Sequence, residues 1–190
     1  VSIETAKTVI ATGSKPSTLP GVEIDKKRII TSTEALELKE VPKNLIVIGA
    51  GVIGLELGSV YGRLGSNVEV VEFMDFAIAG MDADLGKELA RVLKKQLGFK
   101  FHFSHAVKSV KATAKGVTVV ADNKKGEEVK FTGDYCLVSV GRRPYTENLG
   151  LDKAGVKVDN RGRIEVNEHL QTNVEGVYAI GDVVRGAMLA

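Results

Sequence analysis

The feature that most constrains the fold is a glycine-rich turn that follows a short apolar run. Residues 45–48 are Leu, Ile, Val and Ile, and Gly49, Gly51 and Gly54 then follow in the spacing G-x-G-x-x-G. A continuous aliphatic run is typical of a strand buried in a parallel sheet. The glycines predict a tight turn into a helix. Gly51 leaves room for a pyrophosphate beside the main chain, and Gly54 lets the helix lie close to its strand.

The residues around the turn decide its meaning, because a G-x-G-x-x-G motif alone is a weak signal. Apolar residues recur at helical spacing and predict one apolar stripe on a helix that ends near Gly65. They are Ile53, Leu57, Val60 and Leu64. A strand over residues 68–71 follows and ends in Glu72, about where this type of fold needs an acid for the adenine-ribose hydroxyls. The alternative is a helix and a strand that merely pack together, with no nucleotide.

The predicted helix carries two further glycines and one acid. Gly58 and Gly62 form a row with Gly54, and interior glycines each cost about 1 kcal/mol relative to alanine. We therefore expect close backbone packing along that row. Glu56 lies in the first turn on this reading, where the helix dipole favours a carboxylate. It is either a functional acid or an ordinary carboxylate at a helix start.

Composition excludes several function classes. The 26 basic and 24 acidic residues are scattered and leave a net charge of +2, so no basic stripe points to nucleic acid. No apolar run approaches the roughly 20 residues that span a bilayer. Cys136 is the only cysteine and lies in an apolar run, which favours a packing role in a reducing compartment: the cytoplasm, or the mitochondrial matrix of a eukaryote. His102, His105 and His169 show no metal-ligand or triad spacing, so no metal is expected.

The rest of the chain predicts an α/β fold: a Rossmann-like, doubly wound parallel sheet with an inserted antiparallel β-meander. Ser32 or Thr33 is expected to cap a short helix through Leu38, and Asp82 opens a helix that Gly98 ends. The expected strands after this helix are residues 99–103, three alternating meander runs at 106–112, 117–121 and 127–131, and a buried return at 135–140.

Both ends of the sequence stop in the middle of predicted elements. Residues 7–11 and 176–180 form strand-like runs whose neighbours are not encoded, so we expect an excised piece of a longer protein, with truncated strands at both ends. Unpaired strand edges also lead us to expect self-association. The predicted divisions are an arm and linker at 1–41, a dinucleotide-binding domain at 42–145 and a return segment at 146–190.

Five motifs, taken in order, resemble the flavoprotein disulfide reductases of the pyridine nucleotide-disulfide oxidoreductase family. They are residues 11–14 (ATGS), residues 47–58 with Glu56, the acid Glu72, residues 139–146 (SVGRRPYT), and residues 176–184 (GVYAIGDVV) with 188–190. The resemblance implies that an NAD-binding domain is inserted between two parts of an FAD domain, and that the end strands belong to that FAD domain.

The resemblance also assigns residues to the two cofactors. For NAD they are Gly49, Ala50, Gly51, Val52, Ile53, Gly54, Leu55, Glu56, Glu72, Val107 and Gly141, with Ile53 and Glu56 near the nicotinamide and flavin. For FAD in the full-length parent they are Thr12, Gly13, Ser14, Asp182, Met188, Leu189 and Ala190.

Within this family the motifs are most similar to those of members that oxidise dihydrolipoamide through a cysteine pair and FAD and reduce NAD. Such members are homodimers that serve 2-oxo acid dehydrogenase complexes. This chain lacks the cysteine pair, the glycine turn for FAD and a His-Glu pair, so we expect the 190 residues alone to be inactive and nearly free of FAD. The alternatives are a related mercuric, glutathione or coenzyme A disulfide reductase, an NADH oxidase, or a non-catalytic nucleotide-binding module.

Overall fold

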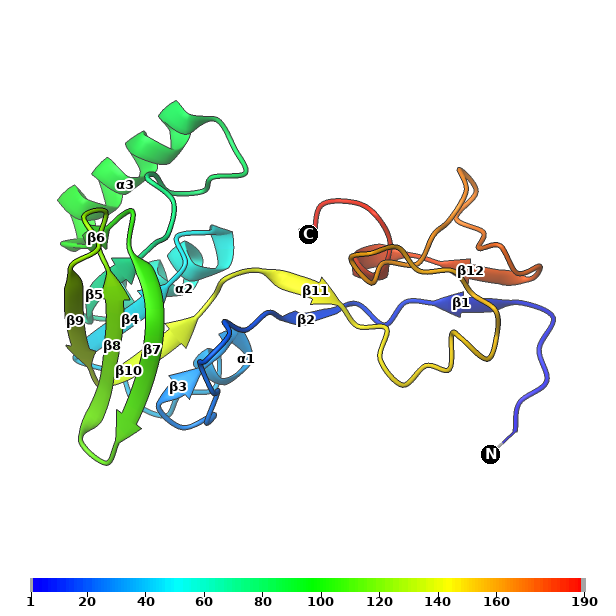
Figure 1. Cartoon of the computed structure of the whole chain (residues 1–190), viewed down its shortest axis with the longest axis horizontal. Coiled ribbons are helices and arrows are strands. Elements are labelled where there is room, and N and C mark those ends of the chain that lie inside the picture. Colours follow the sequence, from blue (N-terminus) through cyan, green and yellow to red (C-terminus); the bar gives the residue numbers. More distant parts are fainter. Residues whose placement is uncertain (1, 189–190) are drawn as a thin grey trace. The chain divides into compact units, whose positions relative to one another are not determined.

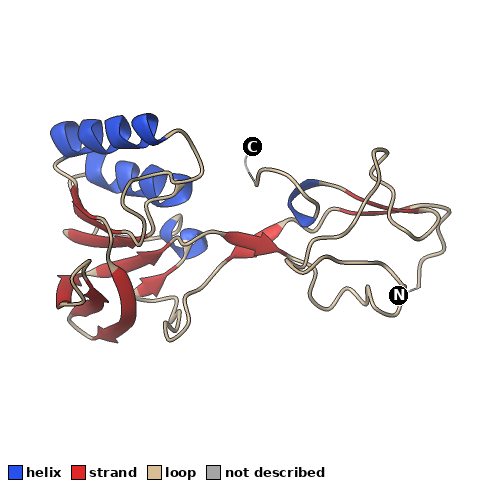
Figure 2. Ribbon diagram, turned by 45° about the horizontal axis from the view of Figure 1, so that its top comes forward, coloured by secondary structure: helices blue, strands red, loops and turns tan. Residues whose placement is uncertain are grey.

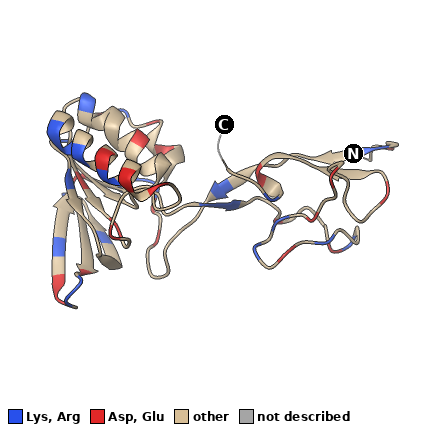
Figure 3. Ribbon diagram, turned by 90° about the horizontal axis from the view of Figure 1, so that it is seen from above, with Lys and Arg blue, Asp and Glu red and all other residues tan. Residues whose placement is uncertain are grey.

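A computed structural model describes residues 2–188 of the chain, which form two units (Figure 1). We call Ser17–Gly141 the central unit, and residues 2–16 together with 142–188 the split unit. The sequence-based divisions lay after residues 41 and 145, whereas the units divide after residues 16 and 141. Figure 3 shows both signs of charge distributed over each unit. Within the described residues, no helix combines the length and the hydrophobicity that crossing a bilayer requires.

The central unit is built on a five-stranded sheet in which every neighbouring pair is parallel. In order across the sheet the strands are β3 (Ile29–Ile30), β10 (Tyr135–Val138), β4 (Asn44–Ile48), β5 (Asn67–Val71) and β6 (Lys100–His102). The predicted parallel sheet is confirmed. The strand before the glycine turn, β4, lies at its centre, so the turn opens at the carboxyl end of a strand buried on both faces.

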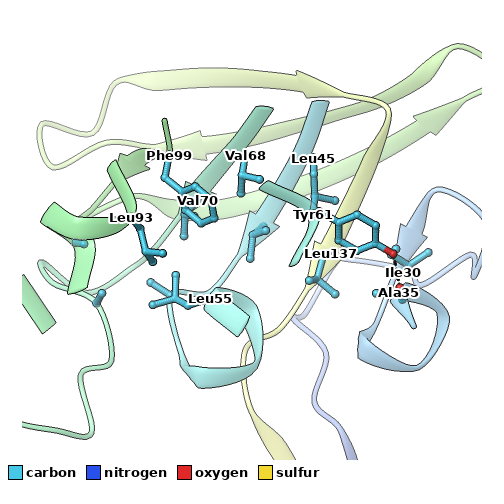
Figure 4. Close-up of a cluster of buried hydrophobic side chains, with 14 residues drawn as sticks. Ile30, Ala35, Leu45, Leu55, Tyr61, Val68, Val70, Leu93, Phe99 and Leu137 are labelled. Carbon is cyan, nitrogen blue, oxygen red and sulfur yellow. Dashed lines mark hydrogen bonds between the residues drawn. The ribbon is translucent and has the colours of Figure 1, made fainter. Parts of the chain in front are cut away.

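Side chains of β4 alternate between two packed layers. Leu45 and Val47 pack with helices α2 (Val52–Arg63) and α3 (Ala83–Leu97) on one face. Figures 2 and 4 show this helical layer, with Leu55 of α2 and Leu93 of α3 directed at the sheet. Successive side chains of a strand point to opposite faces, and both faces of β4 are covered by apolar layers. Every buried position of the strand, residues 45–48, must therefore be aliphatic.

The opposite face of the sheet packs against the predicted meander, which is confirmed. Its antiparallel strands are β7 (Ala106–Thr113), β8 (Gly116–Asp122) and β9 (Glu128–Gly133). Val119 and Phe131 of this meander pack with Ile46, Ile48 and Cys136 of the sheet. The second covering layer is therefore a small sheet, and β10 returns to the parallel sheet after it.

The predicted apolar stripe of α2 is wrong at Val60 and Leu64, whereas Leu57 packs against the core. Val60 is 50% exposed and Leu64 is 58% exposed. The buried residues of this helix are Gly54, Leu55, Gly58 and Tyr61. The reason is the glycine row: a Cβ at Gly62 would lie 2.8 Å from Cε1 of Phe99, so the ring occupies the space that side chains would otherwise take. The row is closely packed, but the backbone packing expected along it is found only at Gly54, because Gly58 and Gly62 face the ring of Phe99.

The first helix differs from its prediction at both ends. Helix α1 spans only Ser32–Ala35, and its N-cap is Thr31 rather than Ser32 or Thr33. The Thr31 hydroxyl accepts from the Thr33 amide at 3.3 Å, and Glu34 accepts from the Thr31 amide at 2.9 Å, which is a capping box. Burial opposes ionisation of Glu34, but these hydrogen bonds from Thr31 outweigh it and lower the pKa of that carboxyl.

The second long helix, α3, fixes the connection that follows β5. Its N-cap is Asp82 and its C-cap is Gly98, as predicted. Gly86 packs so closely on the carbonyl oxygen of Ala77 that a Cβ there would overlap it. The connection at residues 73–81 is thereby held against the helix.

The split unit pairs the two ends of the chain with each other. Strand β1 (Thr8–Ile10) pairs in parallel with β12 (Val177–Ala179), and β2 (Ser14–Pro16) pairs antiparallel with β11 (Arg142–Pro144). The short 3₁₀ helix η1 (Gly181–Val183) follows β12. The expectation that the end strands have no encoded neighbour is therefore wrong, because each pairs with the other in a two-stranded sheet. The expected self-association stays a prediction.

The contact between Gly86 and Ala77 yields a stability prediction. Gly86→Ala should lower the free energy of unfolding of the central unit by about 1–3 kcal/mol, because the added methyl group overlaps a main-chain oxygen. Helix propensity alone would act oppositely, raising stability by up to about 1 kcal/mol. Urea unfolding followed by helical circular dichroism measures this change, since α1, α2 and α3 all lie in the central unit. Leu85→Ala, at a neighbouring side chain that is 62% exposed, is the control.

Candidate functional site

The glycine turn is folded tightly against strand β10. Gly49 has φ +100°, which favours glycine, and a Cβ at this position would lie 2.6 Å from the carbonyl oxygen of Ser139. The Gly49 amide donates to the carbonyl of Val71 at 2.9 Å. Strands on both sides of β4 therefore fix the first glycine of the motif.

Gly54 closes the same contact from the helix side. A Cβ there would overlap both the Gly49 carbonyl oxygen and Oγ of Ser139. The Ser139 hydroxyl donates to the carbonyl of Ile48 at 2.9 Å, with the Gly49 carbonyl at 3.3 Å. This confirms that the third glycine lets helix and strand meet, and it shows that a serine from β10's end takes part.

Gly51 stands apart from the other two glycines. Its φ of −78° is open to any residue, and nothing lies within 4 Å of the position of a Cβ. It is the N-cap of α2, without a side-chain cap hydrogen bond, and the Leu55 amide is bonded to its carbonyl at 3.0 Å. The amides of the first turn are free of intrahelical partners at such an end, and the helix dipole is positive there. The protein itself does not require glycine here, and an anion would find space and donors.

Glu72, the residue directly after β5, reaches the turn. One carboxylate oxygen accepts from the Ala50 amide at 2.6 Å and the other from the Met74 amide at 2.7 Å. The Glu72 main chain is bonded to His102 and His105, at 2.9 Å in each case. The acid predicted from its spacing therefore lies against the second residue of the motif, held from both sides.

A further main-chain bond joins the following connection to the turn. The Ile78 amide donates to the carbonyl of Ala50 at 2.8 Å. Ala50 is thus bonded through its amide to Glu72 and through its carbonyl to Ile78, and its side chain is buried. The turn, the acid and the connection form one hydrogen-bonded set.

The other residues assigned to NAD are distributed around this set. Val52 and Ile53 lie in the first turn of α2 and are half-buried, whereas Leu55 is buried and faces the sheet. Glu56 is exposed and lies in the second turn, because α2 begins at Val52. The prediction that Glu56 lies in the first turn is therefore wrong by one residue.

Two assigned residues lie on other strands of the central unit. Val107 lies on β7, half-buried, where the register with β8 shifts between Val107 and Ser109. Gly141 is exposed and ends the central unit, with its carbonyl bonded to the Ser17 amide at 2.9 Å. It follows Ser139 by two residues.

The residues assigned to FAD lie in the split unit. The Thr12 hydroxyl donates to the carbonyl of Tyr145 at 2.6 Å, and the Gly13 carbonyl accepts from the Tyr145 amide at 2.9 Å. Ser14 and Asp182 are bonded through their side chains at 2.5 Å. Met188 is half-buried, and Leu189 and Ala190 lie outside the described residues.

Cys136 is a packing residue, as predicted. It is fully buried in β10, and burial raises the pKa of its thiol. A thiol kept neutral in this way is a poor nucleophile. Among residues 2–188, no group of three or more His, Cys, Asp and Glu side chains is arranged to hold a metal ion.

Sequence reasoning missed three residues that shape these sites: Ser139, Ile78 and Arg142. Ser139 and Arg142 stand in the SVGRRPYT motif, and a small polar residue after an apolar strand is the signal that marks Ser139. Ile78 contributes its main chain only, so its side chain gives no signal.

Curated proteins of similar sequence include enzymes from plants and an insect. Leghemoglobin reductase of Glycine max is 53% identical over 183 residues, which cover 96% of this chain and 35% of that protein. The mitochondrial dihydrolipoyl dehydrogenase of Pisum sativum is 52% identical, over 96% of this chain and 36% of that protein. The dihydrolipoyl dehydrogenase of Manduca sexta is 49% identical, over 100% and 39% respectively. The chain therefore spans little more than a third of these relatives.

Solved structures with the same fold are flavoprotein reductases and a related protein. The HOCl-induced flavoprotein disulfide reductase RclA of Escherichia coli matches with a TM-score of 0.86 and 29% identity, over 96% of this chain and 41% of that chain. LpdA of Mycobacterium tuberculosis matches with a TM-score of 0.84 and 31% identity, over 96% and 39% respectively. The family described as pyridine nucleotide-disulphide oxidoreductase matches residues 1–190 in full. The chain belongs to the pyridine nucleotide-disulphide oxidoreductase family.

Proposed function

We propose that the central unit is the NAD(H)-binding domain of a dihydrolipoyl dehydrogenase and that the split unit contributes part of its FAD site. The observation that carries the proposal is Gly51: an ordinary φ, no neighbour within 4 Å of a Cβ, and a place at the N-terminus of α2. A glycine that neither packing nor conformation requires is explained by a ligand that approaches the main chain.

The residues of the turn suit a dinucleotide pyrophosphate. The first-turn amides of α2 supply donors and the helix dipole supplies positive potential, so no lysine is needed. The bonds from Ala50 to Glu72 and Ile78 fix the loop before any ligand arrives. A prearranged turn costs less ordering on binding, which favours affinity.

Glu72 supports NAD(H) over NADP(H). Each of its carboxylate oxygens has one main-chain donor, and a carboxylate oxygen can accept a second hydrogen bond, so ribose hydroxyls can be added. Its negative charge would repel a 2′-phosphate. Phe73, Met74 and Asp75, which follow it, are exposed and offer no cation to receive one.

The split unit fits one part of an FAD site. Asp182 offers a carboxylate to ligand hydroxyls. Gly181, beside Asp182, and Gly13, beside its hydrogen-bond partner Ser14, have nothing within 4 Å of a Cβ position. Bound FAD would supply hydride transfer between a dithiol and the nicotinamide. The residues of this chain would hold and orient the two cofactors, because the single buried Cys136 cannot form a redox pair.

The curated relatives favour dihydrolipoamide as the substrate over the mercuric, glutathione and coenzyme A disulfides of related reductases, and over an NADH oxidase. Two of those relatives are named dihydrolipoyl dehydrogenase at 49–52% identity. On this proposal the full-length protein is a homodimer that serves 2-oxo acid dehydrogenase complexes, in the cytoplasm or in the mitochondrial matrix. A nucleotide-binding module without catalysis is the alternative of a different class.

Cofactor choice is the first test. The chain should bind NADH at least about tenfold more tightly than NADPH, because the Glu72 charge opposes the 2′-phosphate. Titrations of both reduced cofactors, followed by their fluorescence, give the two affinities. Glu72→Gln keeps an acceptor for the Ala50 amide and should narrow the difference, whereas Asp75→Asn removes a neighbouring exposed charge and should leave it unchanged. Equal binding of both cofactors by the unaltered chain would contradict the proposal.

The second test asks which glycines of the motif make room for a ligand and which allow the protein itself to pack. Gly51→Ala should leave the free energy of unfolding within about 0.5 kcal/mol of wild type and weaken NADH binding about tenfold or more, since its methyl group enters open space at the helix end. Gly54→Ala should instead destabilise the fold by about 1–3 kcal/mol, because its methyl group overlaps the Gly49 carbonyl and Ser139. Urea unfolding and NADH titration of both variants measure the two effects. Undiminished NADH binding by Gly51→Ala would place the pyrophosphate elsewhere.

A further inference from the structure

Three side chains of the split unit form a chain of hydrogen bonds that the glycine motif does not explain. Arg142, on β11, donates from Nε to Oγ of Ser14 at 2.6 Å and from Nη2 to the Ser14 carbonyl at 2.7 Å. Ser14, on β2, is bonded through Oγ to Oδ2 of Asp182 at 2.5 Å. All three side chains are half-buried, and they come from β11, β2 and η1.

The chemistry of the groups fixes the direction of this chain. A guanidinium has donors only, so Oγ of Ser14 accepts from Arg142. The one hydroxyl proton of Ser14 is then directed to Asp182, which accepts it. Within residues 2–188, no protein hydrogen bond occupies Oδ1 of Asp182, so this oxygen is left for an outside donor. The hydrogen bonds from Arg142 through Ser14 therefore fix Oδ2 of Asp182 and leave Oδ1 available to a ligand.

The neighbouring arginine shows that Arg142 is not simply a surface charge. Arg143 lies next to it on β11, is 54% exposed in its side chain, and pairs with Glu147 at 2.8 Å. Arg142 instead donates two hydrogen bonds to one residue, Ser14. This pair of bonds requires the planar, two-pronged geometry of a guanidinium. A lysine at position 142 could not make both bonds with the same geometry.

We propose that Arg142 is a positioning residue which acts through the Ser14 hydroxyl to hold Asp182 as an acceptor for a hydroxyl group of FAD. The inference rests on the proposed function, because it takes the split unit to be part of the FAD site. It deepens that function by assigning a role to Arg142 and to the side chain of Ser14. Arg142 itself does not touch the cofactor on this proposal.

The test uses the full-length protein of which this chain forms part, stripped of flavin and titrated with FAD while flavin fluorescence is followed. Arg142→Met keeps the length of the side chain and removes its donors, and should weaken FAD binding about tenfold to a hundredfold. Arg143→Met is the matched control and should bind FAD as the wild type does. Equal FAD affinity in the two variants would overturn the inference.

A double-variant comparison distinguishes positioning from general loosening of the unit. If Arg142 acts through Asp182, Arg142→Met should cost no further FAD affinity once Asp182→Ala is present. An undiminished cost in that background would mean that Arg142 supports the fold only, and would overturn the inference. If Arg142→Met does not fold, Ser14→Ala breaks the same chain at its middle and should give the same loss, with Ser14→Thr restoring affinity. Wild-type affinity in Ser14→Ala would equally overturn it.

The wild-type titration separates the two levels of the proposal. A full-length wild-type protein that binds no FAD would overturn the proposed function, and this inference with it. In a second outcome, the wild type binds FAD tightly, Asp182→Ala weakens that binding, and Arg142→Met and Ser14→Ala leave it unchanged. This outcome would overturn the inference about Arg142 but not the proposed function.

Discussion

The central unit depends on the absence of two side chains, at Gly49 and Gly54. Because neither residue has a Cβ, the end of β4 can lie directly against the first turn of α2 and against Ser139, which follows β10. A Cβ at either position would overlap these atoms. That contact directs the N-terminus of α2 past the carboxyl end of the sheet. It also sets Ala50 where its amide and carbonyl bond to Glu72 and Ile78. The geometry proposed to bind an anion therefore follows from close packing, and of the three motif glycines only Gly51 has open space at its Cβ position.

Local patterns in the sequence predicted the elements well, because strands, turns and caps are set by nearby residues. The aliphatic run of β4, the meander, and the Asp82 and Gly98 ends of α3 were all recognised from spacing and turn chemistry. The buried face of α2 was not. The helical periodicity of apolar residues predicted that Val60 and Leu64 would be buried, but both are exposed. The helix instead buries its glycine face, because the ring of Phe99 fills the space beside Gly58 and Gly62.

The long-range parts of the sites could not be derived from spacing. Ser139 reaches the glycine turn across 91 residues, and Ser14 reaches Asp182 across 168. Such pairs are created by sheet topology, by β10 beside β4 and by β1 beside β12. The resemblance to a family supplied Ser14 and Asp182 as residues near a cofactor. It did not supply Arg142, whose proposed role rests on two long-range hydrogen bonds to Ser14.

The position of the meander in the chain has a consequence for the order of folding. Strands β7, β8 and β9 pair with their neighbours in sequence, and β4, α2 and β5 are also consecutive. Such local units form quickly, whereas pairing across long loops must first overcome the entropy of closing them. Strand β10 inserts between β3 and β4 only after the chain has passed through the meander, and Ser139 follows it. The contact between Ser139 and the glycine turn is therefore expected to form late, because Ser139 follows Ile48 by 91 residues and leaves the ribosome long after the turn does.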